Sequence, residues 1–273
     1  MTQTAADLHP TLDPLSVIEA IERNTLNWYR KLASYVPEAA VYEEADHMRV
    51  VSPARHPACN AVLGARFDRT AVPQRIREVL ADFERIGVPM LWWLGPGSKP
   101  VDLARHLADA GLQLTETLHG MAADLRASLP EAAGGKCEIV EAATNEDIAD
   151  WLVPFGETFH IGHECMGMLT PLRSAVIERG PLRFFVVRAD GHPVSCGVLH
   201  ESPDVAALHY IGTRPIARNR GFGSALVAHM TRTAAASGYR VSVLHSTPLS
   251  TDMYGRLGYV EYCRLRTMLW RPG

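Results

Sequence analysis

The fold of this chain is decided by one short stretch, Arg218-Asn219-Arg220-Gly221-Phe222-Gly223. It follows an apolar run, Val205 to Ile211, and it precedes a helical pattern, Ser224 to Ala236. The first turn of a helix has unpaired N–H groups and a partial positive charge, and glycine lets the backbone come close to a bound group. A strand, a glycine-bearing loop and a helix in this order therefore predict a site that holds a pyrophosphate.

Three arginines around this stretch strengthen the prediction. Arg214, Arg218 and Arg220 lie within seven residues, although the whole chain has a formal net charge of −3. Each guanidinium can donate charge-assisted hydrogen bonds to phosphate oxygens, worth roughly 1.5–3 kcal/mol when well placed. We expect all three arginines to contribute to the phosphate site.

Two better-known phosphate loops do not fit the stretch. A P-loop has a lysine followed by serine or threonine after its last glycine, whereas Ser224 and Ala225 occupy these positions. A dinucleotide-binding fingerprint has a third glycine where this chain has Leu226, and it has an acidic residue about twenty positions later, which is also missing. The pattern that remains is Arg-x-x-Gly-x-Gly.

A second pattern follows further along the chain. After a β-branched run, Val241 to His245, the chain has a tyrosine, Tyr254, and then a glycine and an aromatic residue, Gly258 and Tyr259. With both patterns in this order and at this separation, the segment from His209 to Tyr259 resembles the GNAT superfamily of N-acetyltransferases. Members of that family bind acetyl-CoA with the arginine- and glycine-bearing loop.

The resemblance implies acetyl-CoA as the co-substrate and assigns its contacts to ten residues. In the family the strand before the loop splays from its neighbour, so that a backbone N–H, here that of Thr213, faces the thioester carbonyl as a small oxyanion hole. Ile211 and Gly212 would line the pantetheine arm. The residues assigned to cofactor binding are Ile211, Gly212, Thr213, Arg218, Asn219, Arg220, Gly221, Phe222, Gly223 and Ser224.

The resemblance also implies two catalytic side chains. Tyr254 matches the general acid that protonates the departing thiolate, the alternative being a core aromatic residue of a short helix. Many relatives place a glutamate base at the position of Ala207, so His209, two residues further along the same strand face, becomes the expected base. Other candidate bases lie in the helical region after residue 150, and they are Glu157, His160, His163 and Glu164.

Composition narrows the class of protein. Hydrophobic residues at 47% and charged residues at 21% are typical of a globular protein, and no apolar run reaches the length of a membrane span. The five scattered cysteines favour a reducing cytoplasm, and His160 and His163 lack the spacing of a zinc site, so we expect no metal. The net charge provides no basic surface for nucleic acid. We therefore expect a cytoplasmic monomer or homodimer without nucleic-acid or membrane partners.

The length of the chain, 273 residues, suits two domains of 100–150 residues each. Ser128 to Lys136 contains a proline and a glycine pair and is the expected linker. The fold class predicted from the sequence is α/β (α+β), with two GNAT-like domains at 1–130 and 131–273. Each domain is expected to have a mixed, mostly antiparallel twisted sheet flanked by helices, and the second domain is expected to be the catalytic one.

The two halves also share an order of patterns. Aligning Gly111 with Gly258 places Leu107 where Tyr254 stands, so the first half has no phenol there. Its counterpart of the phosphate loop, residues 68–73, has no glycine. We therefore expect the first half to be a degenerate copy that does not bind CoA. The alternative is an unrelated α/β cap.

Local signals predict individual elements. Asp13-Pro14 indicates a helix start, Thr144 to Asp147 a capping box, and Asp190-Gly191 a hairpin turn. Val41 to Val51 is predicted to form one strand, and Met168 to Arg179 a helix. The apolar stripe of the first helix is expected to comprise Leu15, Ile18, Ile21 and Leu26.

Taken together, the patterns predict an acyltransferase that moves an acetyl group from acetyl-CoA to the amine of a small-molecule acceptor by direct transfer. Two alternatives stay open, a non-catalytic CoA-binding sensor or structural module, and a transferase that uses a different acyl donor. The tyrosine favours the enzyme, since a protein that only binds CoA needs no phenol.

Overall fold

The computed structural model describes residues 12–127, 136–161 and 180–273. We call residues 12–127 the N-terminal half and the other described residues the C-terminal half. Several sequence predictions fall outside the described residues, among them most of the linker and the helix expected at Met168 to Arg179. Two of the candidate bases, His163 and Glu164, also lie outside them.

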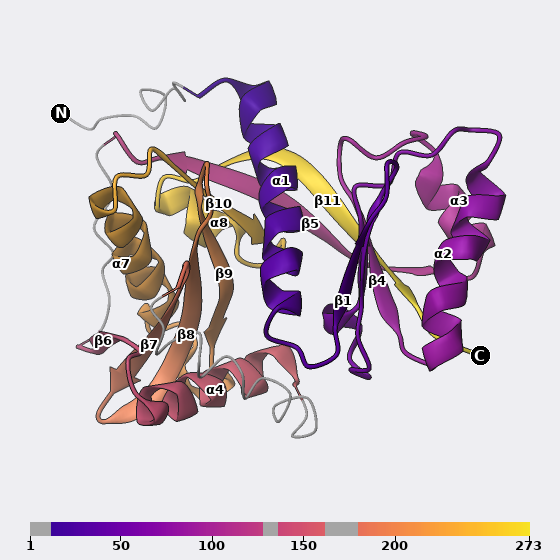
Figure 1. The fold of residues 1–273 in the computed structure, drawn as a ribbon. Helices are drawn as coiled ribbons and strands as arrows, with labels where there is room; N and C mark the ends of the chain where they lie inside the picture. The colour runs from indigo at the N-terminus through magenta and orange to yellow at the C-terminus, as the bar shows by residue number, and fades with distance from the viewer. Residues whose placement is uncertain (1–11, 128–135, 162–179) are drawn as a thin grey trace.

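The described strands form one twisted, mostly antiparallel sheet of eleven strands, in the order β1-β2-β3-β4-β11-β5-β10-β9-β8-β7-β6 (Figure 1). This confirms the predicted fold class. The strands are β1 (Ala40–Glu43), β2 (Met48–Val51), β3 (Ala61–Leu63), β4 (Met90–Leu94), β5 (Gln113–Asp124), β6 (Glu138–Glu141), β7 (Leu182–Ala189), β8 (His192–Glu201), β9 (Ala206–Thr213), β10 (Val241–Ser246) and β11 (Val260–Trp270).

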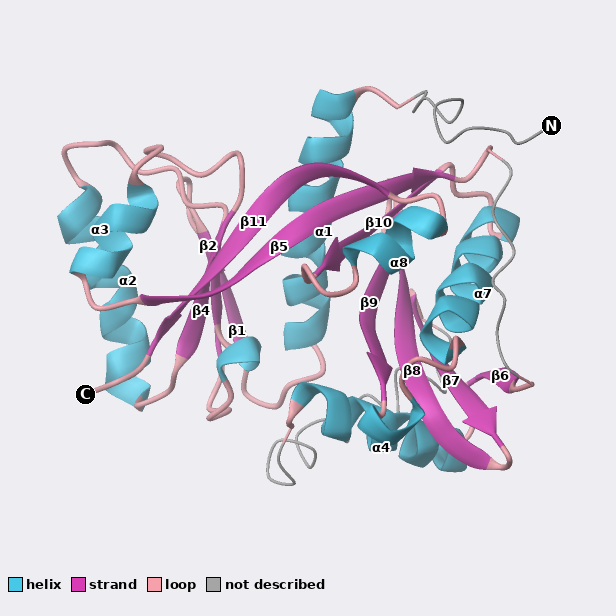
Figure 2. Ribbon diagram, turned by 180° about the vertical axis from the view of Figure 1, so that it is seen from behind, coloured by secondary structure: helices cyan, strands magenta, loops and turns pink. Residues whose placement is uncertain are grey.

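The two halves exchange their last strands at the middle of the sheet. β5 belongs to the N-terminal half but pairs with β10 along the whole of Val241–Ser246. β11 belongs to the C-terminal half but pairs with β4 from Arg266 to Trp270. The two long strands also pair with each other and cross the molecule side by side (Figure 2). A cut at residue 130 therefore divides the sequence without dividing the sheet.

The strand order is the same on the two sides of this central pair. From one edge the order is β1-β2-β3-β4, in which β3 and β4 are parallel, and from the other side it is β7-β8-β9-β10, in which β9 and β10 are parallel. The additional strand β6 lies at the edge beside β7. Each parallel pair is joined through a helix, as parallel neighbours require.

Helices cover both faces of the sheet. They are α1 (Pro14–Ala33), α2 (Val72–Ile86), α3 (Leu103–Asp109), α4 (Asn145–Phe159), α7 (Phe222–Ala236) and α8 (Thr251–Arg256), with short 3-10 turns η2 (Pro57–Cys59) and η3 (Pro215–Ala217). α7 packs on one face of the C-terminal strands, whereas α1 and α4 pack on the other. α1 also contacts the N-terminal strands, so it lies between the halves (Figure 1).

The local signals gave mixed results. The Asp13 carboxylate accepts the Ser16 amide at 2.8 Å, which confirms the predicted start of α1, and the capping box at the start of α4 is confirmed. The turn between β7 and β8 has positive φ at Asp190 and Gly191, as a tight hairpin needs. The prediction of one strand over 41–51 was wrong, because the chain reverses after Glu43 and forms the hairpin β1–β2.

The apolar stripe of α1 was predicted correctly in part. Leu15 is 72% exposed, whereas Ile21 is buried and Ile18 and Leu26 pack partly buried against the core. The face that packs against the sheet also includes Asn24, Thr25 and Trp28. Two of these three side chains are polar, so an apolar pattern alone could not locate this face.

Candidate active site

A bulge in β9 brings two neighbouring side chains to the same face of the sheet. The pairing with β8 shifts between Cys196–Gly212 and Val198–His209, which leaves one extra residue on β9, and Tyr210 has a positive φ of 51°. His209 and Tyr210 both contact Trp28 of α1, although neighbours in a regular strand point to opposite faces. The bulge thereby concentrates polar groups at this point of the strand.

β9 and β10 pair only at their beginnings. The parallel pairing covers Ala206 to Leu208 on β9, whereas β9 continues to Thr213 with partners on β8 alone. The Arg214 amide donates to the Val194 carbonyl on the β8 side at 3.0 Å. Because N–H groups alternate along a strand, the Thr213 amide points to the opposite edge, where β10 has separated.

The loop between β9 and α7 has the backbone geometry that its sequence indicates. Asn219 has φ 60° and Gly221 has φ 82°, both in the left-handed region, and Gly221 is the N-cap of α7. A Cβ at Gly223 would lie 3.2 Å from the Thr213 hydroxyl oxygen, so the start of α7 is packed closely on the end of β9. The first turn of α7 contains no acidic residue that would repel an anion.

The three arginines of the loop differ in what they contact. The Arg214 guanidinium donates to both oxygens of Glu157 on α4, at 2.7 and 3.0 Å. This ion pair raises the pKa of Arg214 and occupies the group that was expected to serve phosphate. Arg218 donates to the Thr213 carbonyl at 3.2 Å, and the guanidinium of Arg220 lies 4.9 Å from the Phe222 ring centroid. Both of these arginines are exposed.

Glu157 and His160 are less suited to act as the base. The Glu157 carboxylate is engaged by Arg214, as described above. His160 ends α4 with a positive φ of 54° and is exposed. Neither side chain has the stacked, enclosed surroundings of His209.

Tyr254 lies on the short helix α8 and is 5% exposed. Its ring packs edge-on against Tyr259, with 6.0 Å between the ring centroids. Burial and, secondarily, the neighbouring Tyr259 raise the pKa of Tyr254, so its hydroxyl is protonated at neutral pH. A protonated phenol is the form that a general acid needs.

Three histidines lie on adjacent strands of the C-terminal half, where α1 covers them. They are His200 on β8, His209 on β9 and His245 on β10. The Trp28 ring stacks on His209 with 4.0 Å between centroids, and Asn24 of α1 lies 3.4 Å from the Nε2 atom of His209. The Thr25 hydroxyl lies 3.4 Å from the Nε2 atom of His245. The sequence analysis proposed His209 as the base and did not anticipate its contacts with α1.

Burial keeps these imidazoles neutral. It lowers the pKa of His209 well below the usual value, with a further contribution from His200 and His245, and it lowers the pKa of both neighbours to about 4. Two buried polar atoms nearby, the Asn24 Oδ1 and the His200 Nδ1, have no hydrogen-bond partner. An imidazole that is neutral at pH 7 can accept a proton from an ammonium group.

A cavity opens beside the bulge, and both halves form its walls. The hollow and the open solvent at its mouth together measure about 500 Å³. α1 and the turn η2 contribute residues from the N-terminal half, and α4 and the sheet contribute the others. The lining residues are Trp28, Leu32, Ala58, Cys59, Trp151, Phe155, Ile161, Phe184, Val198 and Tyr210.

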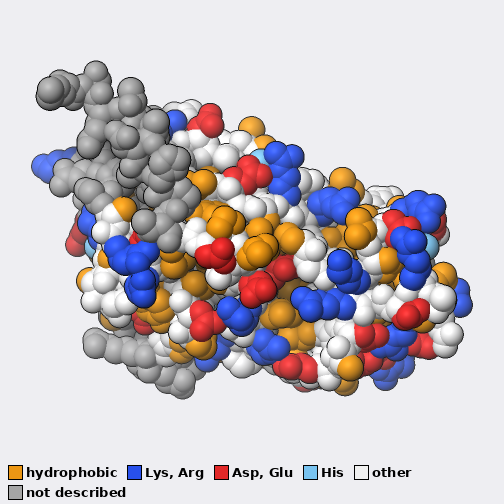
Figure 3. Space-filling view, turned by 90° about the horizontal axis from the view of Figure 1, so that it is seen from above, with side chains coloured by type: hydrophobic (Ala, Val, Ile, Leu, Met, Phe, Trp, Pro, Cys, Tyr) orange, Lys and Arg blue, Asp and Glu red, His pale blue; other side chains and the backbone are white. Residues whose placement is uncertain are grey.

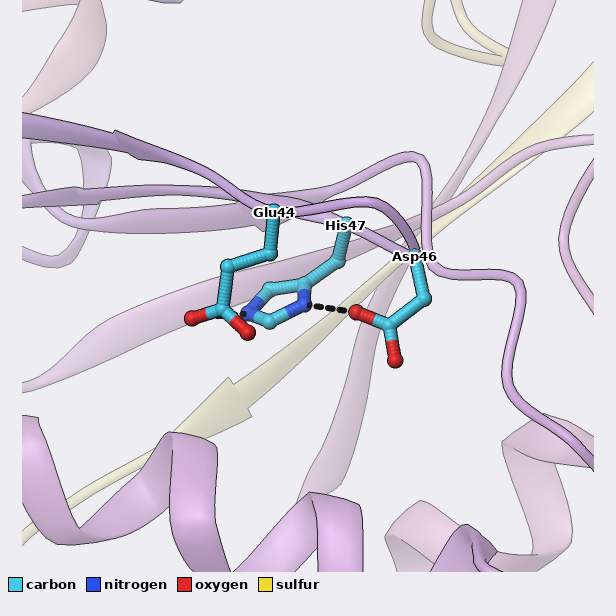
Figure 4. Close-up of side chains that lie close together, drawn as sticks. All are labelled: Glu44, Asp46 and His47. Atoms are coloured by element: carbon cyan, nitrogen blue, oxygen red, sulfur yellow. Dashed lines mark hydrogen bonds and ion pairs between the residues drawn. The ribbon is translucent and has the colours of Figure 1, made fainter.

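One group of possible metal ligands lies elsewhere, at the β1–β2 turn. Glu44, Asp46 and His47 stand close together, with 2.8 Å between the His47 Nδ1 and an Asp46 oxygen (Figure 4). Arg75 donates to both carboxylates at 2.8–2.9 Å, and Arg49 pairs with Glu44. The arginines already neutralise these carboxylates, so the cluster is an ion-pair network that fastens the turn to α2.

The surface and the helices give two further results. On the face seen in Figure 3, basic and acidic side chains are interspersed over the surface.

Among the described residues, no helix combines the length and the apolar character that crossing a membrane requires.

Comparison with known proteins supports the reading of the C-terminal half. Residues 145–259 match the model of the acetyltransferase (GNAT) family. The match covers α4, the bulged strand β9, the loop, and Tyr254 on α8. No curated protein sequence matches the chain.

Solved structures show the fold over nearly the whole chain. A GCN5-related N-acetyltransferase from Kribbella flavida has a TM-score of 0.72 at 18% identity, covering 93% of this chain and 95% of its own. One from Sphaerobacter thermophilus has a TM-score of 0.62 at 15% identity, covering 100% of this chain and 95% of its own. A tandem GNAT protein from the clavulanic acid biosynthesis pathway has a TM-score of 0.57 at 12% identity, covering 87% and 85%.

Residues 145–259 are thus similar to the acetyltransferase (GNAT) family, and the solved structures show that the chain shares their fold.

Proposed function

We propose that the protein transfers an acetyl group from acetyl-CoA to the amine of a small-molecule acceptor. The observation that carries this proposal is the open edge of β9, which ends at the loop before α7. Beyond Leu208 this edge of β9 has no partner strand among the described residues, the Thr213 amide points to it, and the loop leads into the first N–H groups of α7. Such an edge suits an extended arm that ends in a diphosphate.

The residues of the loop fit the diphosphate of CoA. Gly221 and Gly223 leave space at the start of α7, and Asn219 turns the chain so that successive amides converge. Arg218 and Arg220 are exposed beside the loop and supply positive charge there. Phe222 is buried and fixes the first turn of α7 in the core, while Ser224 follows within that turn.

In the proposed reaction the amine nitrogen forms a bond to the acetyl carbon, and the bond from that carbon to the CoA sulfur breaks. The Thr213 amide donates to the carbonyl oxygen while negative charge develops on it. His209 takes one proton from the acceptor ammonium, and Tyr254 gives its hydroxyl proton to the departing thiolate. The nitrogen loses its second proton as the amide forms, and this proton restores the Tyr254 hydroxyl. Both side chains are in the protonation state that these steps require.

α1 orients the proposed base. Asn24 faces the Nε2 atom of His209, and Trp28 fixes the plane of the ring by stacking. The Asn24 amide nitrogen donates to the Nε2 atom, so neutral His209 carries its ring proton on Nδ1 and Nε2 is the atom that can accept a proton. The unpartnered Asn24 and His200 atoms offer places for a water molecule that would carry the proton from the acceptor.

We further propose that the N-terminal half is a copy of the same fold without a cofactor groove. Its parallel pair β3–β4 occupies the position of β9–β10, but the chain beyond β3 stays hydrogen-bonded. The Lys99 amide donates to Ala65 at 2.9 Å, and the Phe67 amide donates to Lys99 at 3.1 Å. These hydrogen bonds occupy the edge of the N-terminal half that corresponds to the open edge of β9 in the C-terminal half.

Two measurements on the full chain test the proposed reaction. Calorimetry should detect CoA binding, and thiol release from acetyl-CoA should increase when an amine is added. Binding without thiol release across a broad amine panel would favour the non-catalytic module. If a longer acyl-CoA releases thiol faster than acetyl-CoA, that acyl-CoA replaces acetyl-CoA as the proposed donor. Failure to bind CoA at millimolar concentration would overturn the proposal.

The base is tested with two variants. We expect His209→Ala to lower turnover with little change in CoA affinity. We expect Asn24→Asp to raise the pKa of His209, because a carboxylate favours the imidazolium. The acid limb of the pH–rate profile should then move to higher pH. A His209→Ala variant with the wild-type pH profile would exclude this histidine.

A further inference from the structure

The cavity beside the bulge has an unusually uniform lining. Of its ten lining residues none carries a charge, and most are aromatic or aliphatic. Trp151 and Phe155 stack at 4.7 Å between centroids, and Tyr210 meets the Phe155 ring edge-on at 5.0 Å. Burial raises the pKa of Tyr210, so this phenol is neutral, and its side chain is hydrogen-bonded by Trp28. A ligand in the cavity would therefore contact the faces and edges of aromatic rings rather than polar groups.

The cavity adjoins the proposed reaction centre. Tyr210 lines it, and the extra residue of the bulge places His209 next to Tyr210 on the same face of β9. Trp28 connects the cavity with the proposed base, because it lines the cavity and stacks on His209. A group in the cavity would thus lie near the open edge of β9, because Tyr210 is three residues from Thr213.

We propose that this cavity binds the apolar part of the acceptor, and that the acceptor is a primary amine carrying an aromatic ring. This inference rests on the proposed transfer reaction and specifies its substrate class. The ring enters the cavity, and the amine stays at the bulge beside His209. Aromatic rings prefer the edge-to-face and offset contacts that the lining provides.

The same lining excludes polar acceptors. A second ammonium group or a sugar hydroxyl inside the cavity would lose its water and find no charged partner on the walls. A hydrophobic pocket discriminates against an added hydroxyl by roughly 100-fold, and an ammonium group costs more to bury without a partner. The structure thus favours arylalkylamines over diamines and amino sugars.

The N-terminal half takes part in this choice. Trp28 and Leu32 come from α1, and Ala58 and Cys59 come from η2. Ala58 is half-exposed, so it lies where the wall reaches the surface. A copy that has no cofactor groove of its own therefore shapes the acceptor site of its neighbour.

An amine panel tests the substrate class. We expect kcat/KM for 2-phenylethylamine to exceed that for putrescine and for glucosamine by at least about tenfold. A preference for either polar amine would overturn this inference and leave the transfer reaction intact. An absence of thiol release with every amine would instead overturn the proposed function.

A space-filling variant tests the location. Ala58→Trp fills the cavity from its half-exposed wall, and we expect KM for 2-phenylethylamine to rise about tenfold while KM for acetyl-CoA stays within about twofold. The matched control is Ala71→Trp, which alters a half-exposed alanine of the same half away from the cavity. Equal effects of the two variants would refute the location.

Direct binding provides a readout that does not depend on turnover. Trp28 and Trp151 line the cavity, so 2-phenylethylamine should change the tryptophan fluorescence of the full chain. Ala58→Trp should raise the dissociation constant from this titration about tenfold, whereas Ala71→Trp should leave it unchanged. A fluorescence change that Ala58→Trp does not weaken would place the amine elsewhere.

Discussion

The loops after β3 and after β9 occupy equivalent places in the two halves but differ in their chemistry. The loop before α7 has glycines at its turn and two exposed arginines. In the loop before α2, the Asp68 carboxylate accepts the Thr70 amide at 2.9 Å, and a proline stands in the first turn of the helix. The carboxylate would repel a phosphate and already uses one amide, and the proline removes another donor.

The difference teaches that the strand order alone does not create a cofactor site. Both halves have a parallel pair joined by a helix, yet in the described structure only β9 separates from its partner while keeping an open edge. Local residues decide the outcome, through a bulge in one strand and through hydrogen bonds to Lys99 beside the other. Four predictions test this comparison, beginning with the largest expected effect.

The largest effect is expected at Tyr254, where the N-terminal half has Leu107. Tyr254→Phe removes the proposed acid, and we expect turnover to fall roughly 10²–10⁴-fold with CoA affinity unchanged. Steady-state kinetics and calorimetry measure the two quantities. The control is Tyr259→Phe, which removes a buried hydroxyl bonded to Thr231 and Ser242 and should affect stability more than turnover. Normal turnover in Tyr254→Phe would make that phenol a packing residue.

The second effect concerns the glycines of the two loops. Gly221→Val forces a β-branched residue into a backbone with φ 82°, and we expect CoA affinity to fall about 100-fold as the loop changes shape. Gly64→Val imposes comparable strain at φ 65° in the N-terminal half and should lower only the melting temperature. If both variants bound CoA equally well, the loop before α7 would not hold the cofactor.

The third effect is the pH dependence of stability, because the three histidines under α1 lie on strands of the C-terminal half alone. The folded pKa of His200 and of His245 is about 4, below the value of about 6.5 in an unfolded chain. As the pH falls from 6.5 towards 4, the unfolded chain binds protons that the folded chain does not bind. The free energy of unfolding must then decrease, whereas above pH 6.5 these groups have no effect.

Urea titrations at several pH values measure this dependence. His245→Gln should reduce the slope of stability against pH by about 1 kcal/mol per pH unit. His192→Gln, at an exposed position on β8, is the matched control and should leave the slope unchanged. An unchanged slope in His245→Gln would mean that this histidine has the same pKa in the folded and unfolded chains.

The smallest effect is expected at Arg214, whose guanidinium is held by Glu157. Arg214→Ala should change CoA affinity less than about threefold and stability by less than about 1 kcal/mol, since the ion pair is partly exposed. Arg218→Ala should weaken CoA binding more, because its guanidinium is exposed beside the loop. Calorimetry at low salt measures the CoA affinity of both variants. A larger loss of affinity in Arg214→Ala would support Arg214 as a phosphate ligand.

Much of the C-terminal half could be predicted from sequence because its signals are local. Glycine, proline and capping residues fix turns within a few positions, as at Asp190-Gly191 and Thr144. The bulge at Tyr210 could not be predicted in this way, because a tyrosine with positive φ has no local preference for it and tertiary packing holds it there.

Long-range partners were also beyond the sequence patterns. β5 and β11 have ordinary strand sequences, and nothing in them specifies a partner in the other half. The polar face of α1 looked solvent-exposed because Asn24 and Thr25 have their partners on strands nearly 200 residues later in the chain. An aromatic residue one turn after such a polar pair, as Trp28 is, was the available signal.

The crossing of β5 and β11 has a consequence for synthesis on the ribosome. Chains generally fold from the N-terminus as they emerge, one unit after another. Here the first half cannot complete its sheet until Arg266–Trp270, which pair with β4, have been made and released. Nascent chains should therefore expose the edge of β4 until β11 has left the exit tunnel.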